Sequence, residues 1–306
     1  MTDTTLLAPL RASLLDRIDA AEPRRLFHGR GRLYEGLEAV TVDLYPPVAV
    51  ITFYGPTEEA LRDAVAGVVL ETIGARVDAV VQQERLRSGT RSQVLLGDVA
   101  EDLVVEEQGL KYRVRPLENQ NTGLFLDVAP LRSWLRERVA GHRVLNLFAY
   151  TCAFSVAAGA GGARSVVNLD LSRTSLDIGR ENHLLNDLDT RAYSFLAHDV
   201  FRSWQKLKRL GPYETLIIDP PTRQRGSFDA EKDYPALLKR IPMLAAPGAQ
   251  ILALLNSPFL PRRFLTEQMS RRCPACRFVD WLPVSADFPD ESTERGLKIG
   301  LFRYEG

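Results

Sequence analysis

Short apolar segments alternate with stretches of helical spacing through the second half of the chain, and this alternation restricts the fold more than any other feature. The apolar segments cover residues 143–148, 165–169, 193–197, 214–218 and 250–255. A helix between two strands returns the chain to the edge where the first strand began, so successive strands run parallel. Parallel sheets are covered by helices on both faces. We therefore predict an α/β fold, a doubly wound Rossmann-like sheet of seven strands, with residues 277–283 and 296–304 as its closing hairpin.

The residues before this region follow a different pattern. Residues 40–118 contain several strand-like segments and one helical stretch at 58–73, which predict a smaller α+β domain that holds the substrate. Residues 1–39 are rich in Arg and Gly and predict a basic N-terminal arm, which either faces water or contacts phosphates. Residues 119–306 then form the α/β domain.

Composition narrows the classes of function only modestly. The 39 basic and 39 acidic residues give a formal net charge of zero, so any surface that attracts nucleic acid must be local. Cys273 and Cys276 have the spacing of metal ligands, but no His lies near them in the sequence, and we expect two ordinary thiols and no metal. An odd cysteine count, no signal peptide and no apolar stretch of membrane-spanning length predict a cytoplasmic protein without membrane contact.

The fourth apolar segment stops at Asp219, which Pro220 and Pro221 follow. Proline has no backbone donor, and it moves the residue before it out of the helical region. We expect Asp219 to lie at the carboxyl end of a buried strand, the edge where open α/β sheets bind ligands. There its carboxylate and a neighbouring carbonyl would accept hydrogen bonds from a planar, amine-bearing group such as a nucleobase. The alternative is that the acid and the prolines only end the strand.

The ends of the first three apolar segments indicate a cofactor. Small residues at 149, 152 and 153 allow a ligand to approach the backbone at the start of the following helix. Asp170 ends the second segment and can accept hydrogen bonds from two ribose hydroxyls, and Asp199 follows the third and can accept one from an adenine amine. Each acid could equally cap the next helix. The turn lacks the glycine pattern of nicotinamide sites, which favours S-adenosyl-L-methionine.

Five motifs together resemble the bacterial class I methyltransferases that modify bases of large-subunit ribosomal RNA, a family with guanine-N7 and cytosine-C5 members. The motifs lie at residues 119–127, 144–155, 170–172, 181–186 and 219–222, and the resemblance covers residues 75–305. It implies S-adenosyl-L-methionine as the cofactor. With the strand ends above, the residues expected to bind it are Asn121, Thr122, Phe125, Asp127, Asn146, Phe148, Ala149, Tyr150, Thr151, Cys152, Ala153, Asp170, Leu171, Ser172, Asn186, His198, Asp199 and Val200.

The turn at Cys152 and Ala153 departs from the family pattern. The family usually has two glycines where this chain has Cys152 and Ala153. A cysteine is restricted where a glycine is not. We therefore expect Cys152 to adopt an ordinary backbone conformation, or the turn to shift.

The resemblance also bears on the atom that is methylated. Cytosine-C5 members attack the ring with a cysteine that follows the fifth strand, where this chain has Asn256 and no cysteine. A base nitrogen attacks with its own lone pair, so positioning and electrostatics suffice. The likeness of Asp219-Pro-Pro-Thr222 to guanine-N7 members favours guanine, with Asp219, Pro220, Pro221 and Asn256 as the catalytic residues.

The sequence therefore predicts a methyltransferase that modifies a base nitrogen in ribosomal RNA, with RNA as its partner. Two alternatives stay open. One is a methyltransferase of a small molecule or a protein side chain, because the fold alone does not fix the substrate. The other is an inactive RNA-binding relative. The nucleotide position and the oligomeric state stay open as well.

Overall fold

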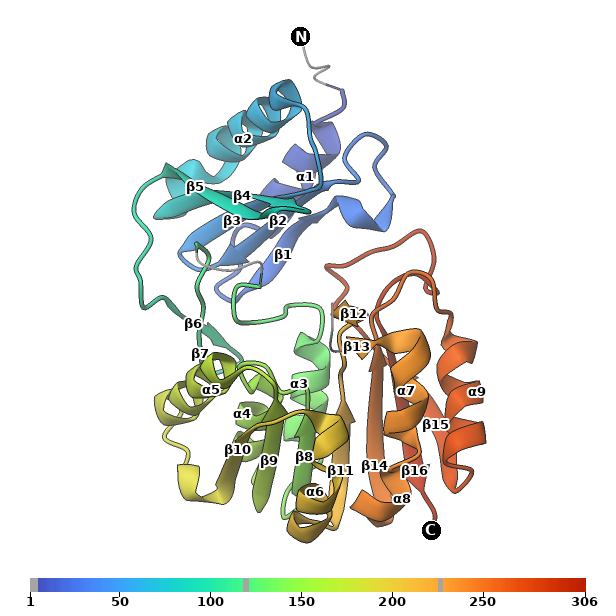
Figure 1. The fold of residues 1–306 in the computed structure, drawn as a ribbon. Coiled ribbons are helices and arrows are strands. Elements are labelled where there is room, and N and C mark those ends of the chain that lie inside the picture. Colours follow the sequence, from blue (N-terminus) through green and yellow to red (C-terminus); the bar gives the residue numbers. More distant parts are fainter. Residues whose placement is uncertain (1–4, 118–120, 225–227) are drawn as a thin grey trace. The chain divides into compact units, whose positions relative to one another are not determined.

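The computed structural model describes residues 5–117, 121–224 and 228–306, and it divides the chain into two units (Figure 1). The N-terminal unit consists of Met1–Asp127 and Ser285–Ser292, and the C-terminal unit of Val128–Val284 and Thr293–Gly306. The boundary predicted between 118 and 119 falls outside the described residues, and the division comes later, after Asp127. Residues 285–292 join the first unit through backbone bonds such as Ser285 N to Asp127 O at 3.0 Å. Such a long-range return has no local signature in the sequence.

The N-terminal unit contains a five-stranded sheet in the order β1-β2-β3-β4-β5. Its strands are β1 (Arg24–His28), β2 (Val40–Tyr45), β3 (Val48–Tyr54), β4 (Ala79–Leu86) and β5 (Gly89–Leu96). Neighbouring strands are antiparallel except β3 and β4, which helix α2 (Glu59–Ile73) connects. β6 (Val104–Glu107) and β7 (Leu110–Arg113) form a separate hairpin. The smaller α+β domain is thereby confirmed.

The basic arm predicted at 1–39 is wrong, because most of that segment is folded. Helix α1 (Ala8–Arg17) buries Leu10 and Leu14 in the apolar core of this unit, and β1 pairs with β2. Strand β1 is short and carries charged residues, so it looks like a solvated run in the sequence. Its Arg25 is compensated inside the sheet by Asp43, with Nε to Oδ1 at 2.7 Å and Nη2 to Oδ2 at 2.9 Å.

The C-terminal unit contains, within the described residues, a seven-stranded sheet in the order β10-β9-β8-β11-β14-β16-β15. Its strands are β8 (Arg143–Leu147), β9 (Ser165–Asp170), β10 (Tyr193–Ala197), β11 (Tyr213–Ile218), β14 (Ala245–Leu255), β15 (Cys276–Leu282) and β16 (Lys298–Tyr304). The first five run parallel, and β16 and β15 are antiparallel. The predicted doubly wound sheet with a closing hairpin is confirmed.

Helices cover both faces of this sheet (Figure 1). One face holds α3 (Ala129–Arg136), α4 (Ala153–Ala160) and α5 (Arg173–Leu185), and the other holds α6 (Trp204–Leu210), α7 (Ala230–Leu238), α8 (Ile241–Leu244) and α9 (Arg262–Arg272). Residues 233–244 are divided between α7 and α8, and Pro242 lies in the first turn of the second helix. Among the described helices, none is both long enough and apolar enough to cross a membrane.

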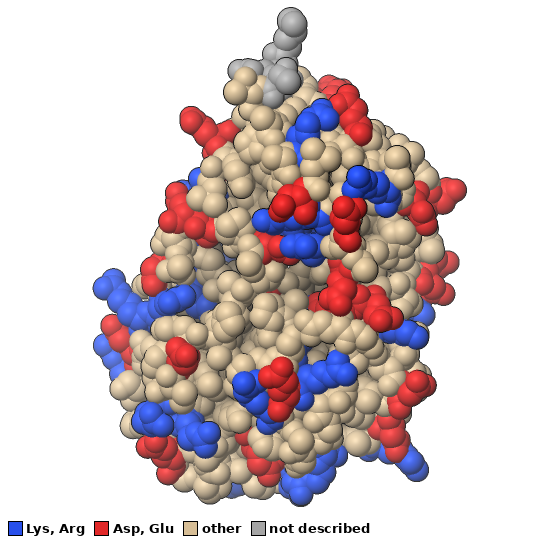
Figure 2. Space-filling view, turned by 180° about the vertical axis from the view of Figure 1, so that it is seen from behind, with Lys and Arg blue, Asp and Glu red and all other residues tan. Residues whose placement is uncertain are grey.

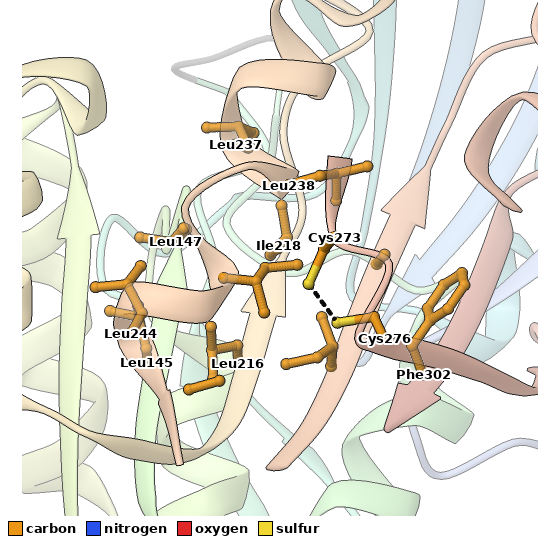
Figure 3. Packing of buried hydrophobic residues seen from close by; sticks show 14 of the residues in the cluster. Leu145, Leu147, Leu216, Ile218, Leu237, Leu238, Leu244, Cys273, Cys276 and Phe302 are labelled. Carbon is orange, nitrogen blue, oxygen red and sulfur yellow. Dashed lines mark hydrogen bonds between the residues drawn. The ribbon is translucent and has the colours of Figure 1, made fainter. Parts of the chain in front are cut away.

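Cys273 and Cys276 lie in the apolar core between α9 and the sheet (Figure 3). Their Sγ atoms are 3.0 Å apart, and both side chains are buried. The hydrogen bond between them lowers the pKa of Cys273 and raises that of Cys276. The described residues contain no group of three or more His, Cys, Asp or Glu side chains able to hold a metal ion. Both thiols pack among the apolar residues of this core.

Candidate functional site

The carboxyl ends of five parallel strands meet along one edge of the C-terminal sheet. Strand order reverses at β8, because β9 and β10 lie on one side of it and β11 and β14 on the other. Open α/β sheets bind ligands at the carboxyl edge beside such a reversal. The segments that leave this edge carry most of the predicted site residues: 148–153, 170–172, 198–200, 219–222 and 256.

The turn after β8 has a backbone that glycine would adopt more easily. Phe148, Tyr150 and Cys152 all have positive φ, at 60°, 47° and 61°. Each such residue costs about 1 kcal/mol or more, because a Cβ atom disfavours this region. Hydrogen bonds from Ala149 N to Leu169 O (3.1 Å) and from Cys152 N to Ala149 O (2.7 Å) hold the turn. The ordinary conformation expected for Cys152 is therefore wrong, since the cysteine occupies the left-handed geometry directly.

The Cys152 side chain is fully buried against helix α5. Gly179 of that helix leaves the room, since a Cβ atom there would lie 2.4 Å from Cys152 Sγ. Burial, and then the charge of Asp170, raise the pKa of the Cys152 thiol well above its ordinary value. The thiol therefore stays protonated and is a poor nucleophile. Beside it, Thr151 is buried, and Ala153 begins α4 partly exposed.

Asp170 and Asp199 present carboxylates at the ends of β9 and β10. The two Asp170 oxygens accept hydrogen bonds from Tyr150 N (2.9 Å) and Ser172 N (2.8 Å). Asp199 Oδ1 accepts one from Phe201 N at 2.8 Å. A carboxylate has about four acceptor positions, so both groups retain capacity for ligand donors. These acceptors fit the hydroxyl donors of a ribose and the exocyclic amine of an adenine.

The residues next to these two acids in the sequence differ in how far their side chains are exposed. Leu171 is 51% exposed and His198 is exposed, so a ligand can contact both side chains. Val200 is buried in the core, which limits it to a packing role. Ser172 caps α5, because its Oγ accepts a hydrogen bond from Ser175 N at 3.1 Å.

Asn146, predicted as a cofactor residue, lies instead in a buried polar network. His183 Nδ1 is 2.6 Å from Gly179 O and must donate to it, so Nε2 accepts from Ser155 Oγ at 2.8 Å. Asn168 Nδ2 donates to Ser155 Oγ (3.0 Å), and Asn146 Nδ2 donates to Asn168 Oδ1 (3.0 Å). Burial lowers the pKa of His183 to about 4, which keeps the imidazole neutral. The network joins β8 and β9 to α4 and α5 behind the turn.

The assignment of Asn186 to the cofactor site is wrong. Helix α5 begins at the carboxyl edge after Ser172 and contains 13 residues. At 1.5 Å per residue it extends about 20 Å, so its C-terminal residue lies at the opposite edge of the sheet. There Asn186 Nδ2 donates to Asn182 O at 2.7 Å.

Four of the predicted cofactor residues belong to the N-terminal unit: Asn121, Thr122, Phe125 and Asp127. Thr122 is buried, and its hydroxyl donates to Tyr45 Oη at 2.7 Å, so it supports its own unit. Phe125 is 44% exposed, Asn121 is exposed and Asp127 is partly exposed. The part of these side chains in cofactor binding stays a prediction.

The turn after β11 holds the predicted catalytic residues. Asp219 is partly exposed, Pro220 is buried, and Thr222 Oγ1 donates to the carbonyl oxygen of Asn256. Asn256 follows β14, the strand next to β11. The turn is thus tied to the end of the neighbouring strand, and Asp219 and Asn256 lie at adjacent strand ends. Pro221, in the same turn as Asp219, is partly exposed.

Tyr234 of α7 supports this turn and was not identified from the sequence. Its fully buried hydroxyl contacts Leu254 O at 2.8 Å and Ile218 O at 3.3 Å, which links the ends of β14 and β11. Burial, and then the charge of Asp219, raise the pKa of the Tyr234 phenol well above its ordinary value. The hydroxyl therefore remains a proton donor. A tyrosine among the apolar residues of a helix was the only sequence signal for this role.

Phe148 packs into an aromatic cluster at the same edge. Its ring centroid is 5.3 Å from that of Phe228, and the Phe228 and Phe201 centroids are 6.3 Å apart. Phe228 lies in β13 (Phe228–Asp229), which pairs with β12 (Arg223–Gln224). The cluster supports the turn after β8 from the side of β11.

The arginines of the segment at 1–39, predicted as a basic arm, differ in their contacts. Arg24 Nη2 pairs with Asp287 Oδ1 at 2.6 Å, and Arg25 pairs with Asp43 inside the sheet. Arg30 is exposed, and its guanidinium lies 3.9 Å from the centre of the Tyr54 ring. Figure 2 shows acidic and basic side chains interspersed over the face it displays, in keeping with the zero net charge.

Comparison with known proteins decides the family. The model of the S-adenosylmethionine-dependent methyltransferase family matches residues 24–303. The chain belongs to this family. The sheet, the acid at the end of β9 and the turn after β8 are therefore parts of a methyltransferase fold, as the motifs predicted.

Relatives of this methyltransferase include proteins named for ribosomal RNA. "Ribosomal RNA large subunit methyltransferase K/L" of Stutzerimonas stutzeri is 38% identical over 213 residues, which cover 65% of this chain and 29% of that protein. "Putative ribosomal RNA large subunit methyltransferase YwbD" of Bacillus subtilis is 31% identical over 84% of this chain and 66% of that protein. The chain thus spans under a third of the first relative and about two thirds of the second.

A solved structure resembles both units of the methyltransferase. SMU.776, described as "a putative methyltransferase complexed with SAH", is 25% identical, with a TM-score of 0.86 over 98% of this chain and 80% of that one. SAH is the demethylated form of the methyl donor. The carboxylates of Asp170 and Asp199 suit the adenosine that both forms contain.

Proposed function

We propose that this methyltransferase transfers a methyl group from S-adenosyl-L-methionine to a base nitrogen of ribosomal RNA, with guanine favoured, in the cytoplasm. The observation that carries the proposal is the turn Asp219-Pro220-Pro221-Thr222, fixed at the end of β11 directly beside the turn of β8. The names of the relatives from Stutzerimonas stutzeri and Bacillus subtilis support RNA as the substrate class.

Two groups of residues at the carboxyl edge would have different roles, one in binding the cofactor and one in binding the base. Asp170, Asp199 and the turn at 148–153 would hold the adenosine part of the cofactor on the β9 and β10 side. When bound, S-adenosyl-L-methionine supplies an electrophilic methyl group. Asp219 would accept hydrogen bonds from the amine or N–H edge of the base on the β11 side. Because these groups are held by backbone and buried hydrogen bonds, little reorganisation is needed at the moment of transfer.

The available side chains favour nitrogen over carbon chemistry. Attack on cytosine C5 requires a thiolate that adds to the ring. Cys152 is buried with a raised pKa, and Cys273 and Cys276 are buried in the core beyond α9. The described strand end after β14 offers Asn256 instead. A guanine nitrogen needs no covalent intermediate, so orientation by Asp219 and its neighbours is sufficient.

The proposal is tested with the Asp219→Ala variant. Asp219 lies on the base side of the edge, so the variant should lose methyl transfer to ribosomal RNA by at least about 100-fold, in line with the loss of a positioning or charge-stabilising group. Its affinity for S-adenosyl-L-methionine, measured by calorimetry, should stay within about twofold, well under the tenfold that 1.4 kcal/mol represents. Transfer is measured with labelled donor on purified ribosomal RNA.

Asp189→Ala is the matched control, because Asp189 is an exposed acid that pairs with Arg191 before β10, at the opposite edge. It should behave as the unaltered protein in both assays. An equal loss of cofactor affinity and transfer in Asp219→Ala would show that Asp219 belongs to the cofactor site. Full activity of that variant would refute its catalytic role.

A further inference from the structure

Phe259 is the most exposed large apolar side chain among the described residues, at 86%. It lies in the loop between β14 and α9, three residues after Asn256. An aromatic ring left in water gives up the favourable burial that such side chains normally provide. Single exposed apolar residues are common on protein surfaces, so its position and its support must decide whether it has a role.

The loop that carries Phe259 is firmly held. Lys298, which is 1% exposed, donates from Nζ to Ser257 O at 2.5 Å and to Glu294 O at 2.8 Å. The buried Ser257 hydroxyl accepts from Phe259 N at 3.3 Å. Burying a lysine ammonium group costs free energy unless the group forms hydrogen bonds such as these. The ring is therefore exposed on a fixed backbone.

The same loop is joined to the proposed catalytic turn. Thr222 Oγ1 donates to Asn256 O, and Ile218 lies opposite Ala253 in the β11–β14 pairing. Strand β14 thus continues two residues beyond the partner of Ile218, alongside the start of the Asp219 turn. Three residues span at most about 10 Å, so Phe259 stays close to that strand end.

We propose that Phe259 is a stacking platform for the nucleobase presented to Asp219. This inference rests on the proposed function, since it requires an RNA base as substrate. A base offers a flat π face to an aromatic ring, and proteins that bind unpaired nucleotides use exposed aromatics in this way. Asp219 would bind the edge of the base while Phe259 covers one of its faces. Edge and face contacts together fix the plane of the ring for attack on the methyl group.

Stacking and simple apolar burial predict different results for an aliphatic replacement. Phe259→Leu keeps most of the apolar surface and removes the π face, whereas Phe259→Tyr keeps both. A protein or lipid partner covering this residue would accept leucine. Leu184→Ala is the matched control, because Leu184 is 60% exposed on α5 near the opposite edge of the sheet.

The experiment measures kcat and KM for methyl transfer to a ribosomal RNA fragment, with cofactor affinity and melting temperature for each variant. Phe259→Ala and Phe259→Leu should lower kcat/KM by about tenfold or more, the scale of one base–aromatic stack. Phe259→Tyr and Leu184→Ala should stay within about twofold of the unaltered protein. Cofactor affinity and melting temperature should not change in any variant, because the ring is exposed.

Two results would overturn the inference. Unaltered kcat/KM in Phe259→Ala would show that the ring makes no productive contact. Full activity in Phe259→Leu with loss in Phe259→Ala would assign it to apolar contact rather than stacking. Failure of the proposed function is distinguishable, because the unaltered protein would then transfer no methyl group to any ribosomal RNA, and the stacking role would fail with it.

Discussion

Gly179→Ala tests how the turn after β8 tolerates Cys152. A Cβ atom at Gly179 would lie 2.4 Å from Cys152 Sγ, 2.9 Å from Cys152 Cβ and 3.3 Å from the carbonyl carbon of Thr151. The first two distances are shorter than any ordinary contact. The cysteine is fully buried, so its sulfur has no free space to move into.

Two opposing effects determine how much Gly179→Ala changes the free energy of unfolding. Alanine in the middle of α5 is favoured over glycine by about 1 kcal/mol. Overpacking a buried site costs about 1–3 kcal/mol, and contacts with a Cβ atom place this site at the upper end. We expect Gly179→Ala to lower the free energy of unfolding by about 2 kcal/mol.

The destabilisation by Gly179→Ala should disappear, or become a stabilisation, when Cys152 is replaced by glycine. Cys152→Gly removes both close atoms and places glycine at a φ of 61°, where it is unstrained. In that background no contact shorter than the 3.3 Å to Thr151 remains, and Gly179→Ala should be neutral or stabilising by up to about 1 kcal/mol. The coupling between the two sites is then about 2–3 kcal/mol.

Urea unfolding of the unaltered protein, both single variants and the double variant measures this coupling. Additive effects, within about 0.5 kcal/mol, would show that the two side chains do not clash. So would a Gly179→Ala variant more stable than the unaltered protein, because the close contact would then not exist.

Two further predictions concern buried polar groups. Tyr234→Phe should lower the free energy of unfolding by about 1–2 kcal/mol in urea, because Leu254 O and Ile218 O lose their buried donor; unchanged stability would mean that water replaces the hydroxyl. The folded pKa of His183, about 4, lies below its unfolded value near 6.5, so the unfolded state binds the extra proton and stability falls as pH decreases from 6.5 to 4. His183→Gln should show a shallower fall over that interval than the unaltered protein, the remaining slope including that of His28, whose pKa is also lowered; an identical slope would contradict the assignment.

Much of the C-terminal unit could be predicted from the sequence because its signals are local. Strand–helix alternation predicted the parallel sheet. The two prolines after Asp219 predicted that the strand ends there, and β11 ends at the residue before it. In each case one short segment contains both the residue and the physical cause of its conformation.

The failures have causes that lie far apart in the chain. The segment at 1–39 looked solvated because Arg25 finds its partner, Asp43, on the next strand. Cys152 keeps a glycine-like conformation because Gly179 of another helix leaves space for its sulfur. Asn186 falls inside a family motif, but the direction of α5 carries it away from the carboxyl edge. Tertiary contacts of this kind override local preference and cannot be read from spacing.

Mass spectrometry of ribosomal RNA nucleosides shows whether this protein methylates a base of ribosomal RNA in cells. RNA from cells that lack this protein is compared with RNA from cells that contain it and from cells rescued with Asp219→Ala. We predict that one methylated base, a methylguanine by preference, is missing without the protein, returns with the unaltered chain and stays absent with the variant. Identical nucleosides in all the samples would contradict ribosomal RNA as the substrate.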